Sequence, residues 1–203
     1  MKRFFRIFVL NLSKVRNFIC KYFNRLFLYI LGVKCGRNCV IHGYLGLKLA
    51  SDSIVSIGDN FYLSSGNHIN PLARNVQGHI CVNKGAKLVI GDNVGMSSPI
   101  IWAHKSIVIG NNVMLGANVT IMDSDAHSLI YLHRRELSVD KLHKADAEVV
   151  IEDDVFIGMN TIILKGITIG ARSVIGAGSV VVKSIPAGCI AAGNPARVIK
   201  LLE

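Results

Sequence analysis

The sequence predicts an all-β fold, a parallel β-helix of hexapeptide repeats, with a short amphipathic helix in front of it and one long loop leaving it. An aliphatic residue recurs every six positions near the C-terminus, at Ile151, Ile157, Ile163, Ile169, Ile175 and Val181. Residues 1–32 instead repeat apolar residues at three- and four-residue steps, which is the period of a helix. The six-residue period is interrupted between residues 126 and 148.

The composition narrows the range of functions. With 203 residues, 51% of them hydrophobic and 18% charged, the chain can form one domain with a sizeable core and is not disordered as a whole. Residues 1–37 hold nine of the 23 basic residues and none of the 13 acidic ones, so the net charge of +10 belongs to one short segment. This distribution argues against a nucleic-acid partner. The five cysteines lack the spacing of a zinc site, which predicts free thiols in a reducing cytoplasm.

Residues 1–32 are expected to form a basic amphipathic helix. Apolar residues such as Val15 and Ile19 fall on one face, and basic residues such as Lys14 and Lys21 fall near the opposite one. No apolar run approaches the roughly 20 residues that span a bilayer. Two interpretations stay open. The helix either lies on an anionic membrane surface, which would place the protein at the inner face of the membrane, or packs as a cap on the rest of the protein.

Residues 33–200 are expected to form the β-helix. Six residues with one large aliphatic position make one side of a triangular coil, and successive turns stack through parallel backbone hydrogen bonds. The repeat phase places Trp102 at an inward position. Interruptions are expected near 70–89 and at 126–148. The second is long and rich in histidine, and long excursions from a rigid scaffold are where binding and chemistry concentrate.

One histidine stands at the start of this loop excursion. His127 directly follows a regular coil turn, and the carboxylates Asp123 and Asp125 lie close to it in sequence. Imidazole titrates near neutral pH, which suits a general base, although a surface histidine is the alternative. Asp125 is expected to orient the ring or to hold a polar acceptor. Asp123 either contacts the acceptor or only shapes the turn.

The chain resembles a known family in four stretches: IGNNVMLGANVTIMDSDAH, IEDDVFIGMN, IGAGSVVVKSIPAG and AAGNPARVIK. They are similar to the hexapeptide-repeat acyltransferases, in particular the maltose, galactoside and xenobiotic O-acetyltransferase branch. The resemblance is good from about Ile90 to Lys200. It implies a left-handed coil, a homotrimer with active sites between subunits, acetyl-coenzyme A as acyl donor without a metal, and a catalytic His127.

The resemblance also assigns cofactor-binding positions. The nucleotide end of coenzyme A is expected at Val182, Lys183, Arg197 and Lys200, and its pantetheine arm at the backbones of Met159 and Ala177. Spaced cations are what the phosphates of this molecule require. A solvated coil corner is the alternative for Lys183. Relatives often have Thr in place of Val182 and a small residue in place of Met159, so contacts by these two side chains are in doubt.

The acceptor side carries fewer signals. Ser97 aligns with an Asn of sugar-using relatives, and Arg135 lies where related enzymes often have a basic residue, although an ordinary exposed arginine fits equally well. The expected function is acetyl transfer from acetyl-coenzyme A to a sugar hydroxyl of a surface or lipid-linked polysaccharide. The alternatives are a xenobiotic or free-sugar acetyltransferase, a zinc enzyme similar to the γ-carbonic anhydrases, and a non-catalytic hexapeptide scaffold.

Overall fold

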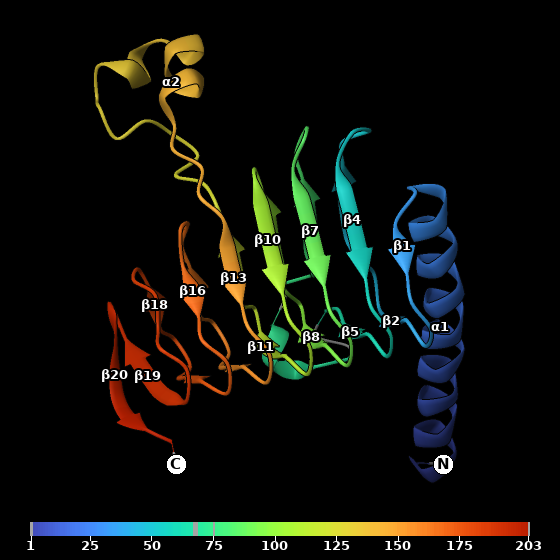
Figure 1. The fold of residues 1–203 in the computed structure, drawn as a ribbon. Helices are drawn as coiled ribbons and strands as arrows, with labels where there is room; N and C mark the ends of the chain where they lie inside the picture. The colour runs from blue at the N-terminus through green and yellow to red at the C-terminus, as the bar shows by residue number, and fades with distance from the viewer. Residues whose placement is uncertain (1, 67–68, 75, 203) are drawn as a thin grey trace.

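The chain forms one long helix followed by a three-sided stack of short strands (Figure 1). This computed structural model describes residues 2–66, 69–74 and 76–202, with side chains described from residue 15 onward. The helix, α1 (Lys2–Ile30), lies beyond the first strand at the N-terminal end of the stack (Figure 1). The apolar and basic positions expected before residue 15 lie outside the described side chains.

Three sheets form the sides of the coil. The first contains, in spatial order, β1 (Lys34–Cys35), β4 (Ile54–Ile57), β7 (Lys87–Ile90), β10 (Ser106–Ile109), β13 (Val149–Ile151) and β16 (Thr168–Ile169). The second contains β2 (Val40–His42), β5 (Tyr62–Ser64), β8 (Gly95–Ser97), β11 (Met114–Ala117), β14 (Phe156–Ile157), β17 (Val174–Ile175), β19 (Cys189–Gly193) and β20 (Ala196–Leu201). The third contains β3 (Gly46–Leu49), β6 (His79–Val82), β9 (Ile100–Ala103), β12 (Thr120–Met122), β15 (Ile162–Ile163) and β18 (Val180–Val181). Neighbouring strands run parallel within each sheet, and β20 returns antiparallel to β19.

Isoleucines stack in register along the inside of the first sheet. The aligned residues are Ile57, Ile90, Ile109, Ile151 and Ile169. All five are buried, and burying one such side chain contributes roughly 1.5–3 kcal/mol. The six-residue phase read from the sequence is therefore confirmed as the core of the coil.

Asparagines form the corner between the first and second sheets. Asn38, Asn60, Asn93 and Asn112 all adopt φ between 56° and 58°. Asparagine tolerates this left-handed conformation better than most residues with a Cβ. Each Nδ2 donates to the side-chain oxygen of the next residue in the row, and the row ends at Asp154. These side-chain bonds tie successive turns together outside the apolar core.

Two details of the predicted coil are wrong. The first interruption ends before residue 79, because β6 and β7 already place Ile80 and Leu88 inside, with His79 and Lys87 exposed at outward positions. Trp102 is not inward. Its neighbour Ile101 is buried while Trp102 is 40% exposed, because the turn at 97–99 is one residue shorter than the repeat phase requires.

The second excursion leaves the coil after β12 and returns at β13. A bridge between Ser124 and Asp146 closes its base. It contains a 3-10 turn, η2 (His133–Arg135), and a short helix, α2 (Leu137–His143). Another 3-10 turn, η1 (Pro71–Ala73), lies in the first interruption. Figure 1 shows α2 standing away from the strands, on the side of the coil far from α1.

Candidate active site

His127 is held by a buried carboxylate that belongs to the same excursion. Its Nδ1 lies 2.6 Å from Oδ2 of Asp140, a residue of α2. The other oxygen of Asp140 accepts a hydrogen bond of 2.7 Å from the backbone N–H of Ser128. The side chain of Asp140 is 5% exposed, whereas that of His127 is 66% exposed. A carboxylate on Nδ1 holds the proton there and leaves Nε2 free to accept another.

The same contacts set the charge of Asp140. The hydrogen bond from His127, and after it the bond from the Ser128 N–H, lower the pKa of Asp140 although burial opposes the shift. Arg134 adds a smaller favourable contribution. Asp140 is therefore ionised at neutral pH and acts as a fixed acceptor for the ring.

Neither carboxylate expected beside His127 bonds to it. Oδ2 of Asp125 lies 3.4 Å from Nζ of Lys165, on the next turn of the coil. Asp123 is fully buried, and its two oxygens accept the backbone N–H groups of residues 104–106 at 2.6–2.8 Å. Asp140 therefore occupies the orienting position expected of Asp125. Asp123 shapes the turn, because both of its carboxylate oxygens accept hydrogen bonds from backbone N–H groups.

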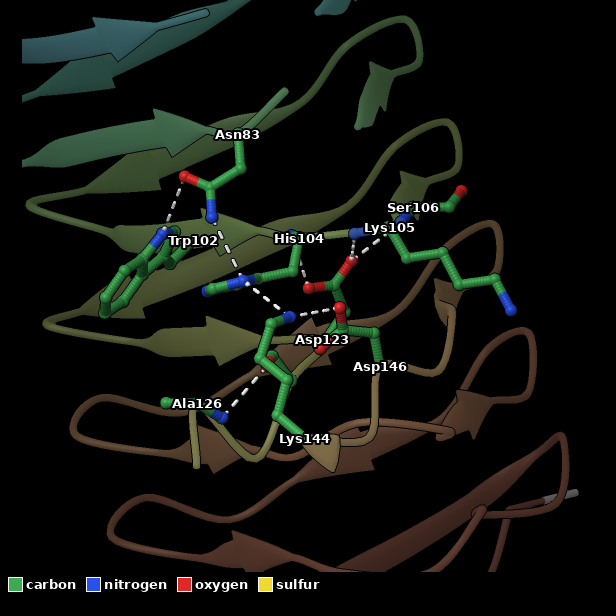
Figure 2. A network of polar contacts seen from close by, with 10 residues as sticks. Asn83, Trp102, His104, Lys105, Ser106, Asp123, Ala126, Lys144 and Asp146 are labelled. Carbon is green, nitrogen blue, oxygen red and sulfur yellow. Dashed lines mark hydrogen bonds and ion pairs between the residues drawn. The ribbon is translucent and has the colours of Figure 1, made fainter. Parts of the chain in front are cut away.

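A polar network fixes the base of the excursion (Figure 2). Nδ1 of His104 lies 3.0 Å from Nδ2 of Asn83 and 3.2 Å from Nζ of Lys144, and Lys144 also pairs with Asp146. Burial, and after it the charge of Lys144, lowers the pKa of His104, so this ring is neutral at pH 7. Beside it Trp102 donates from Nε1 to Asn83 and presents its ring on the outer face of the third sheet. The network joins both ends of the loop that carries His127.

A cleft of about 500 Å³ lies on the outer face of the second sheet. Its lining includes Ser97, Met159 and Ala177 together with Asn70, a glycine of β11 and the glycine that follows β14. The hydroxyl oxygen of Ser97 accepts from Nδ2 of Asn70 at 2.7 Å and from Oγ of Ser64 at 3.1 Å. With both lone pairs engaged, the Ser97 hydroxyl proton is the group left to donate to a bound molecule.

The structure divides the predicted site residues between two edges of the coil. Ser97 ends β8, and it lines the cleft beside the corner between the second and third sheets. His127 and Lys183 follow β12 and β18, at the corner between the third and first sheets. The width of the third sheet separates these edges within one chain. Accordingly, His127 is not part of the cleft lining.

The remaining predicted residues lie on the surface. Val182 and Lys183 are exposed after β18, and Arg197 and Lys200 are exposed on β20. Arg135 lies in η2, where its guanidinium sits 5.4 Å from the centre of the Tyr131 ring. No three His, Cys, Asp or Glu side chains among the described residues are grouped so that they could hold a metal ion.

Two residues of the site had no clear signal in the sequence. Asp140 lies 13 positions beyond His127, in a helix that no sequence repeat predicts. Asn70 precedes Pro71, and this Asn-Pro pair is typical of a turn, but nothing in it points to Ser97. Each contact involves at least one residue from an interruption of the coil, whose course the six-residue period does not describe.

Comparison with known proteins identifies the family. Residues 148–183 match the bacterial transferase hexapeptide (six repeats), and residues 106–122 match the hexapeptide repeat of succinyl-transferase. A galactoside O-acetyltransferase of Lactococcus lactis is 32% identical over 83% of this chain and 73% of its own length. A putative acetyltransferase of Schizosaccharomyces pombe is 45% identical over 48% of this chain and 44% of its own length. A crystal structure of a hexapeptide-repeat containing acetyltransferase of Vibrio cholerae covers 82% of this chain and 75% of its own, with 26% identity and a TM-score of 0.52.

Fold and comparisons together define a coil of hexapeptide repeats of the kind found in bacterial transferases. The chain belongs to the hexapeptide-repeat acyltransferase family, since the Lactococcus relative matches over most of both proteins. The predicted left-handed β-helix and the resemblance to the galactoside O-acetyltransferase branch are confirmed. The chain spans less than half the length of the Schizosaccharomyces relative.

Proposed function

We propose that the protein transfers an acetyl group from acetyl-coenzyme A to a sugar hydroxyl, with His127 as general base. The observation that carries this proposal is the hydrogen bond between Nδ1 of His127 and Asp140. Nε2 takes the proton of the acceptor hydroxyl while the hydroxyl oxygen attacks the thioester carbonyl carbon. The carbon–sulfur bond then breaks, and the departing thiolate takes the proton back from His127. The products are an acetyl ester and free coenzyme A.

The cleft on the second sheet suits the donor. Its small residues Gly158 and Ala177 leave room for a slender pantetheine arm along the coil edge. Lys183, Arg197 and Lys200 are exposed and therefore available to the phosphates of coenzyme A. The free donor on Ser97 gives a hydrogen bond for the acceptor or for the developing oxyanion. The names of the relatives support acetyl as the transferred group.

The placement of the two halves supports a homotrimer with active sites between subunits. Within one chain, His127 and the cleft with Ser97 lie on different edges of the coil. A cyclic trimer sets one edge of each copy against another edge of its neighbour, which would bring His127 of one copy to the cleft of the next. Exposed apolar residues of the excursion, among them Leu129 and Leu142, favour such a contact.

For the acceptor we propose a glycan at a membrane surface. The exposed ring of Trp102 offers the flat apolar surface on which a sugar face stacks, and polar groups of Asn83 and His104 surround it. Relatives named galactoside and polysialic acid O-acetyltransferase act on carbohydrates. The basic segment at residues 1–37 favours an acceptor near anionic lipid at the inner face of the membrane.

The test is thiol release from acetyl-coenzyme A in the presence of free sugars, nucleotide sugars, lipid-linked glycans and chloramphenicol-like drugs. With a productive acceptor, His127→Ala should lower kcat by about 10²- to 10⁴-fold. The matched control is His143→Ala, which removes another exposed histidine of the same excursion. Equal activity of His127→Ala and wild type would exclude His127 as the base. Failure to bind coenzyme A would overturn the assignment of the donor site.

A further inference from the structure

α1 presents an apolar surface that no described part of the chain covers. Its outward-facing large apolar side chains are between 54% and 80% exposed: Val15, Phe18, Ile19, Tyr22, Phe23, Leu26, Tyr29 and Ile30. They recur at three- and four-residue steps over four turns of one helix, so they form a continuous stripe. An exposed apolar stripe of this length marks a surface that contacts another body.

The opposite face of α1 explains why the stripe points outward. Asn24 is buried there and donates from Nδ2 to the backbone oxygens of Ile41, at 3.2 Å, and Gly43, at 2.8 Å. These oxygens lie at β2, the edge strand of the second sheet at the end of the coil. Leu28 is buried beside Asn24. The helix therefore caps the coil with a partly polar face, and the apolar stripe is left for something else.

The charges beside the apolar stripe indicate what kind of surface the stripe contacts. Arg16 and Arg25 are exposed on its two flanks, and the first 37 residues contain no acidic residue. A second copy of the same face would bring these like charges together, which opposes association through the stripe. An anionic lipid surface instead meets the basic flanks with opposite charge and takes up the apolar stripe. No helix of the described residues is long and apolar enough to cross a membrane.

We propose that α1 is an interfacial helix that docks the protein on an anionic bilayer with its apolar stripe in the lipid. The helix lies across the N-terminal end of the coil, so docking stands the coil upright on the membrane (Figure 1). His127 follows the fourth turn, since β1, β4, β7 and β10 are successive strands of the first sheet. At about 4.8 Å for each turn and about 10 Å for the helix, His127 stands roughly 25 Å from the lipid surface.

The height of His127 above the lipid indicates which acceptor hydroxyls it can reach, and this inference rests on the proposed function. A hydroxyl of a lipid headgroup or of the first sugar on a lipid carrier would lie well below His127. The acceptor is therefore a sugar farther along a glycan that extends from the membrane. A lipid-linked acceptor series of increasing glycan length should show transfer only above a threshold length. Equal transfer to a single lipid-linked sugar would overturn this part of the proposal.

Docking is tested with the full chain and two kinds of vesicle, phosphatidylcholine alone and phosphatidylcholine with phosphatidylglycerol. Binding should favour the anionic vesicles and weaken as salt increases. Ile19→Glu, within the stripe, should lower the affinity by about tenfold or more. Ile54→Glu is the matched control, because Ile54 is also 60% exposed but lies on β4. Arg16→Gln with Arg25→Gln should also weaken binding by about tenfold or more.

The orientation has its own reporter. Trp102 is the single tryptophan, and it lies in the third turn of the coil, so brominated lipid should leave its fluorescence unquenched. A tryptophan introduced as Tyr22→Trp in a Trp102→Phe background should be quenched. Quenching of Trp102 together with unquenched fluorescence of Tyr22→Trp would show the opposite orientation.

Three results would overturn the docking proposal: equal binding to both vesicles, wild-type binding by Ile19→Glu, or dissociation of a lipid-free assembly by Ile19→Glu. The last result would assign the stripe to a second copy. Transfer to a soluble sugar is assayed without vesicles, where Ile19→Glu should match wild type. Loss of docking and loss of catalysis are therefore separate outcomes.

Discussion

The coil and the excursion at residues 124–146 achieve order by different means. In the coil each turn repeats the one before, and aligned isoleucines such as Ile109 and Ile151 bury similar side chains at every step. In the excursion, order comes from single contacts such as Asp140 with His127, and most apolar side chains of that segment are exposed. Many equivalent contacts give a stable scaffold, whereas a few unique ones fix the position of the candidate base. Substitutions in the coil should therefore affect folding, and those in the excursion should affect chemistry.

The largest effect is expected from the core of the coil. Ile162 and Ile163 are neighbours in β15, but Ile163 is fully buried and Ile162 is 40% exposed. Ile163→Ala should lower the free energy of unfolding by about 2–5 kcal/mol, because it leaves a cavity in the stack. Ile162→Ala should cost about 1 kcal/mol or less, and denaturant unfolding of both variants measures the difference. Similar losses for the two would contradict the assigned inward phase.

Asp140→Asn should produce the next effect, which is on the rate. Asparagine keeps the shape but loses the charge that holds the proton on Nδ1, so kcat should fall by about 10²-fold or more, while KM for acetyl-coenzyme A stays unchanged. The pH profile of kcat should shift as well, which a purely structural role would not cause, and Asp140→Glu should restore part of the rate. Glu136→Gln changes an exposed carboxylate at the start of α2 and should remain as active as wild type. A wild-type rate for Asp140→Asn would leave His127 without its positioning residue.

The two regions differ in how far the sequence predicted them. The coil was predictable because one physical demand, an aliphatic side chain facing inward, recurs every six residues, as at Ile157 and Ile163. One error arose where a turn lost one residue, and this shifted Trp102 to the outside. The boundary of the first interruption was wrong for a different reason, since the outward His79 and Cys81 of β6 obscured a regular turn.

Within the site, the position of the candidate histidine was more predictable than the identity of its hydrogen-bond partner. His127 stood out because it follows a regular turn, but its partner was expected in the adjacent sequence and lies instead on α2. Short distance in sequence favoured Asp125, whereas folding of the excursion brought Asp140 to the ring. A contact that occurs once and involves an interruption of the coil cannot be predicted from the six-residue repeat. The same holds for Asn70 and Ser97.

Mixing two inactive variants should restore activity to about one fourth of the wild-type level, a smaller effect than the previous ones. This experiment tests whether the cleft of one copy works with His127 of its neighbour. Ala177→Trp fills the cleft on one edge, and His127→Ala removes the base on the other. If each site uses one edge from each of two neighbours, trimers reassembled from equal amounts should recover about a quarter of wild-type activity. Light scattering checks that the mixture is trimeric. No recovery in a confirmed mixed trimer would place the whole site within one chain.

The smallest effect is expected from acid, and it should separate the excursion from the coil. The pKa of Asp140 is lower in the folded protein, mainly through the hydrogen bond from His127 and then the Ser128 N–H. Its contribution is therefore complete above the ordinary aspartate pKa of about 3.9 and is lost as the pH falls through the lower, folded value. Hydrogen exchange, expressed as protection relative to the unfolded chain, should show residues 126–146 loosening below about pH 4. Residues 106–122 of the coil should keep their protection, because apolar burial there does not titrate. Asp140→Asn should lower the protection of the excursion already at neutral pH. Equal acid sensitivity of both segments in the wild-type protein would mean that the coil, not the carboxylate, responds to acid.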